Sequence, residues 1–178
     1  MKDSIKKRII EKGRDLLFTK TEEEITMNLI ANELNITAPT LYHYFKGKDE
    51  LLTAANQLIV DEISAHLDIK FPPSIPFEMR IITATSTVAD YFWNTGLPAS
   101  YLIEDPQDKP VKLGEFRKKF AGMFAELKKT DKIKTKMSAE QIMYRYLAAM
   151  TADLVYHRGT GKGLPEDFAE KVWQQSCP

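Results

Sequence analysis

Hydrophobic residues along most of the chain recur every three or four positions, the spacing that places them on one face of an α-helix. The first such segment runs from Ile5 to about Phe18. After a charged connector come MNLIANELNI, a segment beginning near Thr37, and residues 48–67. No stretch alternates apolar and polar residues as a half-buried strand does. The pattern therefore predicts an all-α fold.

Helix-end signals divide the second and third segments. Thr26 and Thr37 are each placed to cap a helix, and Pro39 lies in the first turn of the third, where a missing N–H costs no helical bond. Asn35, which tolerates the left-handed conformation, follows the last apolar position of the second helix. Two short helices joined by such a turn predict a helix-turn-helix.

The third helix has an outward face suited to DNA. Leu41 and Phe45, four residues apart, are expected to face the core, which leaves small and hydrogen-bonding residues outside. The predicted DNA-binding residues are Met27, Asn28, Thr37, Ala38, Pro39, Thr40, Tyr42, His43, Lys46 and Lys48. On spacing alone, a helical hairpin whose tyrosines merely cover a core remains an alternative.

These residues are expected to divide into two groups by function. The first group can reach phosphates, and it consists of Thr37 with the free N–H groups of the helix start, Tyr42, Lys46 and Lys48. Such contacts fix the position of the protein on DNA without specifying sequence. Thr40 and His43 are expected to touch base edges. Replacing a lysine should then weaken binding to all sequences, whereas replacing His43 should change which sequence is preferred.

The segment LIANELNITAPTLYHYFKGKDELL resembles the signature of the TetR (tetracycline repressor) family. The matching positions are Ile30, Ala31, Ile36, Thr37, Leu41, Tyr42, Phe45, Lys48, Leu51 and Leu52. Asn35 stands where the family often has glycine. The resemblance covers roughly the first 55 residues. It implies an all-α homodimer that represses transcription and releases DNA when a small molecule binds.

The remainder of the chain predicts a second helical module. FPPSIP, residues 71–76, cannot stay helical and is expected to be a linker. Further helices are predicted over residues 77–95, from Pro98, over about 111–129, over 139–159 after a capping box, and over 166–175. We expect an N-terminal three-helix helix-turn-helix domain, residues 1–50, joined to a helical ligand-binding and dimerisation domain, residues 51–178.

Aromatic rings gather in this second module beside small hydroxyl groups. Mostly apolar walls with a few polar groups are typical of a ligand cavity, here for a small apolar or aromatic effector. The candidate pocket residues are Thr85, Ala89, Trp93, Tyr101, Phe116, Phe120, Phe124, Tyr146 and Asp153. The alternative that these residues form an ordinary core stays open.

A homodimer is expected because one short recognition helix reads few bases. Two copies related by a two-fold axis would read a palindromic operator in double-stranded DNA. The candidate interface residues are Ala148, Ala149, Ala152, Phe168, Val172 and Trp173, on the last two predicted helices. The alternative is that they only close the core of one subunit.

Composition narrows the functional classes. Lys+Arg and Asp+Glu are both 25, so a nucleic-acid contact has to be a local patch. A single cysteine, Cys177, excludes an internal disulfide, and no signal peptide or apolar span is evident, so we expect a cytoplasmic protein without a membrane partner. The three histidines lack metal-ligand spacing, and GTGKG follows a helix rather than a strand. We predict no metal, no cofactor and no enzyme activity.

Together these observations predict a sequence-specific DNA-binding transcriptional regulator, a repressor released from its operator by a small-molecule ligand. A ligand-binding or scaffold dimer that has lost DNA binding is the main alternative, and a helical enzyme is a third class. The uncharged helix tip beside Lys46 and Lys48 argues against lost DNA binding. The missing catalytic constellation argues against the enzyme.

Overall fold

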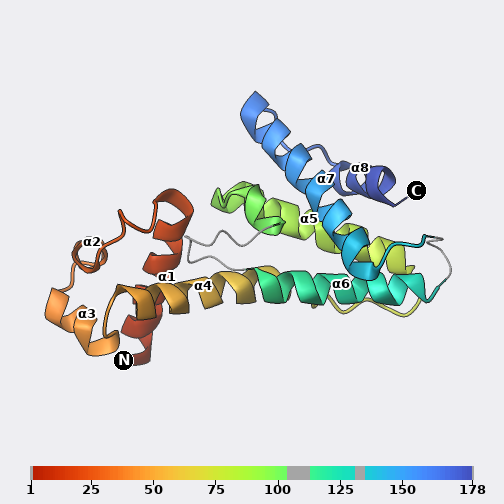
Figure 1. Cartoon of the computed structure of the whole chain (residues 1–178). Coiled ribbons are helices and arrows are strands. Elements are labelled where there is room, and N and C mark those ends of the chain that lie inside the picture. The colour runs from red at the N-terminus through yellow and green to blue at the C-terminus, as the bar shows by residue number, and fades with distance from the viewer. Residues whose placement is uncertain (1, 104–112, 131–134, 178) are drawn as a thin grey trace. The chain divides into compact units, whose positions relative to one another are not determined.

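The computed structural model describes residues 2–103, 113–130 and 135–177, and within them every regular element is a helix (Figure 1). The predicted all-α fold is confirmed. The chain divides into two compact units, of which the first holds the described residues up to Glu62 and the second those from Ile63 on. This division lies inside a helix, whereas the sequence places the boundary at residue 50. That residues 1–50 and 51–178 are separate domains stays a prediction.

The described residues of the first unit form four helices. They are α1 (Lys2–Thr19), α2 (Met27–Glu33), α3 (Ala38–Tyr44) and α4 (Lys48–Ala65), the last of which continues into the second unit. The core of the unit is formed by aliphatic residues from all four helices, among them Ile9, Ile30, Leu41 and Leu51, each with 0% of its surface exposed. Burial of these side chains stabilises the unit and fixes the faces of its short helices.

The turn between α2 and α3 follows the local signals of the sequence. Thr26 Oγ1 accepts a hydrogen bond from the Leu29 N–H at 3.1 Å and caps α2. Asn35 has a φ of 53°, the left-handed conformation that the sequence predicts there. Thr37 Oγ1 accepts from the Thr40 N–H at 3.4 Å and caps α3. These predictions are confirmed.

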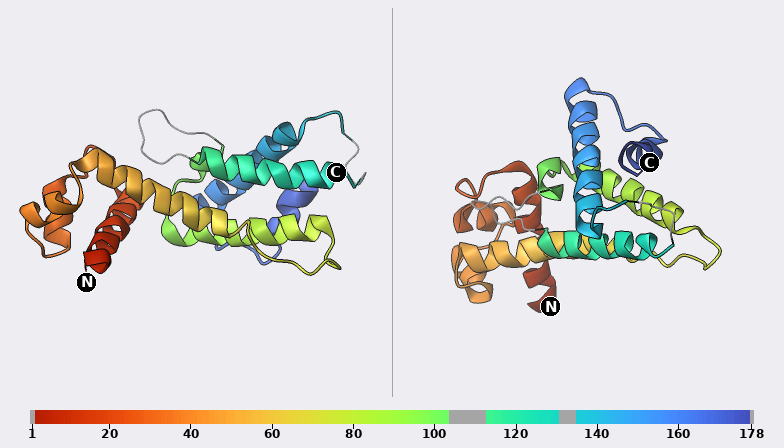
Figure 2. Two further views of the ribbon diagram at one scale, coloured as in Figure 1. Left: turned by 90° about the horizontal axis from the view of Figure 1, so that it is seen from below. Right: turned by 45° about the vertical axis from the view of Figure 1, so that its right-hand side comes forward.

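The second unit consists of helices packed around α7. Its elements are α5 (Phe77–Thr95), the 3-10 helix η1 (Ala99–Leu102), α6 (Gly114–Lys128), α7 (Ala139–Thr160) and α8 (Phe168–Ser176). Helix α7 packs against α5, α6, α8 and η1 (Figure 2). None of the helices in the described parts of the chain is both long and apolar enough to cross a membrane.

Most predicted boundaries in this unit agree with the structure. Gly96, at φ 76°, ends α5, and the Ser138–Gln141 capping box begins α7. Three details differ. The segment after Pro98 is a 3-10 helix, α8 begins at Phe168, and α6 begins at Gly114, while the predicted start near Val111 lies outside the described residues.

Candidate nucleic-acid interface

Helix α3 is held in the first unit by one side and exposed on the other. Leu41 and Phe45 are 0% and 2% exposed, and they fix the inward side as the sequence predicts. On the outward side Tyr42 is 53% exposed, and His43 and Pro39 are also exposed. A helix anchored in this way presents its polar face in one orientation, which base readout requires.

The two threonines at the start of α3 bind to each other. Thr37 Oγ1 lies 2.8 Å from Thr40 Oγ1, in addition to accepting the Thr40 N–H. Thr37 is exposed and Thr40 is half-buried. The pair therefore orders the first turn of α3, and the exposed hydroxyl of Thr37 is the one nearer to solvent. Its predicted contact with a phosphate stays a prediction.

The two lysines after α3 differ in their surroundings. Lys48 is half-buried, and its Nζ donates to the backbone oxygen of Glu22 at 3.0 Å. This bond ties the connector before α2 to the start of α4. Lys46 is exposed, and no carboxylate among the described residues pairs with its ammonium group. Its backbone N–H donates to Glu50 Oε2 at 2.7 Å, which closes the first turn of α4.

The structure corrects one expected DNA contact. Met27 is the first residue of α2 and is only 7% exposed, because its side chain is part of the core of the first unit. Its side chain is therefore not available to DNA. The neighbouring Asn28 is exposed, and Ala38 is half-buried.

One cation that sequence reasoning missed lies close to α3. Lys6 of α1 is exposed, and its Nζ lies 5.6 Å from the centre of the Phe45 ring. Phe45 is the residue at which α3 ends. No local motif marks Lys6, since its neighbourhood depends on how α1 crosses the end of α3. The sequence feature that could have pointed to Lys6 is the set of basic residues on the polar face of α1.

The predicted ligand-pocket residues in the second unit form a closely packed cluster. The Phe116, Phe120, Phe124 and Tyr146 rings have neighbouring centroids 5.3–5.9 Å apart, and each side chain is at most 2% exposed. Tyr146 Oη lies 2.9 Å from Thr85 Oγ1, which is itself buried. Burial raises the pKa of Tyr146 and keeps its hydroxyl protonated, although the Thr85 hydrogen bond partly offsets this effect.

The other predicted pocket residues are more scattered. Ala89 is buried and Tyr101 is 4% exposed, whereas Trp93 and Asp153 are half-buried. The Trp93 ring lies against the guanidinium of Arg158, 5.9 Å from ring centre to Cζ.

A cavity of about 300 Å³ lies between α6 and α7, and it is lined by Gly114, Arg117, Lys118, Ala121, Glu140, Met143 and Tyr144. None of the nine predicted pocket residues lines this cavity, so the effector site stays a prediction.

The predicted interface residues divide into two groups. Ala148 and Ala152 are exposed on α7 and Ala149 is half-buried. Phe168 and Val172 are 4% and 0% exposed, because they form part of the core of the second unit. These two side chains are already covered by their own chain, which corrects the expectation that they face a partner. Trp173 is half-buried beside Tyr146, with ring centres 6.2 Å apart.

Three large side chains on α7 were missed by sequence reasoning. Tyr144, Val155 and Tyr156 are 45%, 59% and 56% exposed. With Ala148 and Ala152 they follow helical spacing, so they share one face of α7, which we call the α7 stripe. The sequence feature that could have predicted the α7 stripe is the recurrence of apolar residues four positions apart.

Part of the first unit is similar to a known protein family. Residues 9–55 match the family described as "Bacterial regulatory proteins, tetR family", and the match includes all of α2 and α3. The uncharacterized HTH-type transcriptional regulator YhgD of Bacillus subtilis (strain 168) is 27% identical over 86 residues. This match covers 48% of the chain and 45% of that protein, so the chain spans less than half the length of the curated relative.

Solved structures share the fold over nearly the whole chain. A TetR-family transcriptional regulator from Haemophilus influenzae RD aligns with a TM-score of 0.75 at 18% identity, covering 99% of this chain and 98% of that one. A TetR transcriptional regulator from Legionella pneumophila aligns with a TM-score of 0.70 at 19% identity, covering 96% of each chain. The helical fold beyond the matched segment is thus shared with these solved structures.

Proposed function

Because residues 9–55 match the tetR family of bacterial regulatory proteins, we propose that the chain is a transcriptional regulator of this family and represses transcription by placing α3 in the major groove of a specific operator. The observation that carries this proposal is the outward face of α3, with Tyr42 and His43 exposed while Leu41 and Phe45 are buried. Hydroxyl and imidazole groups can bind base edges or phosphates, and the buried pair holds them at a fixed orientation.

Phosphate binding is assigned mainly to Lys46 and Tyr42, with Thr37 at the helix start. The ammonium of Lys46 is exposed, whereas that of Lys48 already donates to Glu22. Lys48 would then act by holding the connector in place, and Thr40 and His43 would contact bases. A contact to phosphate supports affinity without selecting sequence, and a contact to a base edge selects sequence.

The test begins with selection of bound sequences from a random DNA pool. Affinity for the selected site is then measured over a range of salt concentrations. Lys46→Ala should weaken binding to all sequences about equally and reduce the slope of log affinity against log salt by about 0.9 for each phosphate that Lys46 neutralises. His43→Ala should instead change the preferred base at one position of each half-site, at a cost of about 1–3 kcal/mol.

Lys162→Ala is the matched control for the loss of a positive charge, since Lys162 is exposed and lies in the second unit. It should leave both affinity and salt dependence unchanged. If Lys46→Ala and His43→Ala both behave like Lys162→Ala, α3 is not the DNA-binding element.

We further propose that the chain binds its operator as a homodimer through the α7 stripe. Exposed apolar side chains on one helix face are typical of a protein interface, and two copies would read a palindrome. Val155→Glu should yield a folded monomer with much weaker operator affinity. Gln174→Glu, at an exposed position of α8, introduces the same charge away from the stripe and should leave the dimer intact. A wild-type monomer at micromolar concentration in light scattering would contradict the dimer.

Release from the operator is assigned to a small apolar or aromatic effector bound in the second unit, where the aromatic cluster lies. On this proposal the chain acts in the cytoplasm by binding rather than by catalysing a reaction. A compound screen that scores loss of operator binding tests the release. An effector should also raise the melting temperature of the free protein, because a ligand that binds only the folded state stabilises it. Failure to find any compound with both effects in a broad apolar library would count against release by ligand.

A further inference from the structure

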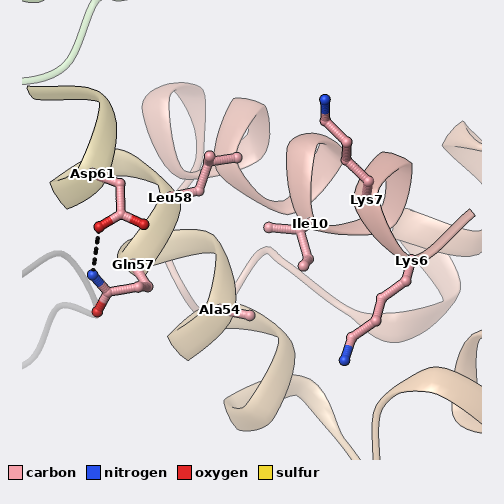
Figure 3. A pocket seen from close by; sticks show the side chains of 7 residues that line it. All are labelled: Lys6, Lys7, Ile10, Ala54, Gln57, Leu58 and Asp61. Carbon is pink, nitrogen blue, oxygen red and sulfur yellow. Dashed lines mark hydrogen bonds between the residues drawn. The ribbon is translucent and has the colours of Figure 1, made fainter. Parts of the chain in front are cut away.

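A groove of about 450 Å³ lies between α1 and α4 of the first unit (Figure 3). Three half-buried aliphatic side chains, Ile10, Ala54 and Leu58, form its apolar part. None of the residues assigned above to DNA, effector or dimer lines it. The groove is therefore a separate feature of the DNA-binding unit, and its chemistry can be considered independently.

The two ends of the groove carry different charges. Lys6 and Lys7 extend from α1 at one end, and Gln57 and Asp61 of α4 lie at the other, joined by a hydrogen bond of 2.8 Å (Figure 3). Within the described part of the chain, Lys6 has no carboxylate partner. Lys7 Nζ lies 3.8 Å from Glu11 Oε1, and the Lys7 side chain is 76% exposed. The two ammonium groups point away from each other (Figure 3), so Lys6 is the one that a carboxylate in the groove can pair with, while Lys7 adds positive charge at the same end.

We propose that this groove binds a small amphiphilic anion, an alkyl carboxylate whose chain covers Ile10, Ala54 and Leu58 and whose carboxylate pairs with Lys6. The aliphatic part favours methylene groups, because their burial removes apolar surface from water. The lysines attract the carboxylate, and Asp61 at the far end repels it. The charges therefore select both the class of ligand and its direction in the groove.

The size of the groove favours a small molecule over a protein. Its volume lies within the range of roughly 300–1,000 Å³ that small-molecule sites occupy. Seven residues line it, whereas a stable protein interface uses about 20–30 residues on each side. Its apolar side chains are aliphatic and no aromatic ring lines it, so stacking cannot select a flat aromatic acid.

Lys6 also connects the groove to α3. Its Nζ lies 5.6 Å from the ring centre of Phe45, the residue that ends α3. A carboxylate in the groove would compete with this ring for the ammonium group. A bound ligand therefore reaches a side chain that is part of the surroundings of the recognition helix.

The first experiment is calorimetric titration of the full chain with octanoate, below the concentration at which octanoate forms micelles. Octan-1-ol and octylammonium provide the same alkyl chain with no charge and with the opposite charge. Octanoate should bind most tightly and octylammonium least. Lys6→Ala should weaken octanoate about two- to fivefold, the range for exposed ion pairs, and Lys7→Ala should weaken it less. Equal binding of the three compounds would overturn the proposal.

The second experiment blocks the groove itself. Ala54→Leu places a larger side chain at its apolar part, and Thr53→Leu makes a leucine at the adjacent exposed position of α4, outside the groove. Ala54→Leu should weaken octanoate at least tenfold, and Thr53→Leu should have no effect, with unchanged melting temperatures for both. Octanoate should shift the methyl NMR signals of Ile10 and Leu58. Unchanged affinity in Ala54→Leu, or shifts confined to the second unit, would show that the groove is not the binding site.

Discussion

The crossing of α1 and α4 depends on the absence of a side chain at Gly13. A Cβ atom at this position would lie 2.6 Å from Leu51 Cδ2 and 3.2 Å from Ala55 Cβ. The first distance is shorter than side-chain atoms tolerate, and Leu51 is 0% exposed, so its side chain cannot move out into solvent. We therefore predict that Gly13→Ala destabilises the protein, although alanine favours helix formation more than glycine does.

Two opposing contributions set the size of the effect. Replacing glycine by alanine inside a helix stabilises by about 0.5–1 kcal/mol. Adding a methyl group to a closely packed core costs about 1–3 kcal/mol. At mid-range the second contribution is larger, so Gly13→Ala should lower the free energy of unfolding by roughly 1 kcal/mol. In a Leu51→Ala background the closest contact is removed, and the same change should become neutral or stabilising.

Gly122 provides the matched control within the same chain. It lies inside α6, it is exposed, and a Cβ atom there would meet nothing within 4 Å. Gly122→Ala should therefore stabilise by about 0.5–1 kcal/mol. Urea unfolding followed by circular dichroism measures both variants. Tryptophan fluorescence alone would not suffice, because Trp93 and Trp173 both lie in the second unit. If Gly13→Ala stabilises as much as Gly122→Ala, the close helix crossing is wrong.

Three further predictions concern the second unit. The Thr85 hydroxyl donates to a backbone oxygen, so the Tyr146 hydroxyl must donate to Thr85. In urea unfolding, Tyr146→Phe should then lower the free energy of unfolding by about 1 kcal/mol, and Thr85→Val, which leaves the buried Tyr146 hydroxyl without an acceptor, by about 1–3 kcal/mol. Arg158 donates to two backbone oxygens around the end of α5, so Arg158→Ala should lower the melting temperature, whereas a change at exposed Lys162 should not. Burial raises the pKa of Cys177 to about 11 from an ordinary 9.0, so at pH 8 alkylation should be about a hundredfold slower than in unfolded protein; equal rates would contradict that burial.

The helix ends could be predicted because their signals are local. Thr26, Thr37 and Ser138 each accept a hydrogen bond from an N–H three residues away, and Asn35 adopts its own left-handed conformation. A residue type at one position is sufficient to indicate each of these features. The helix-turn-helix and the outward face of α3 follow from them together with the spacing of Leu41 and Phe45.

The features that were missed depend on residues far apart in the sequence. Lys48 has the residue type of a phosphate ligand, but its partner, the Glu22 carbonyl, comes from the connector before α2. Met27 begins a helix, yet the packing of the first unit buries its side chain. Phe168 and Val172 lie on an amphipathic helix, and spacing alone cannot say whether the apolar face of that helix meets its own chain or a partner. Such outcomes are decided by tertiary packing.

Pairing of charges explains how a chain without net charge can have a local site for DNA. Lys+Arg and Asp+Glu are both 25, so the total charge attracts no polyanion. In the first unit Lys12 pairs with Glu33 at 3.4 Å and Arg14 pairs with Glu62, while Lys48 donates to a backbone oxygen. These cations are used inside the unit, whereas Lys46 beside α3 is exposed and unpaired among the described residues. On the proposed docking, Lys46 and Lys6 are the exposed cations near α3, so one copy of the chain neutralises few phosphates and the salt dependence of operator binding should be shallow. Most discrimination between sites then comes from the uncharged face of α3.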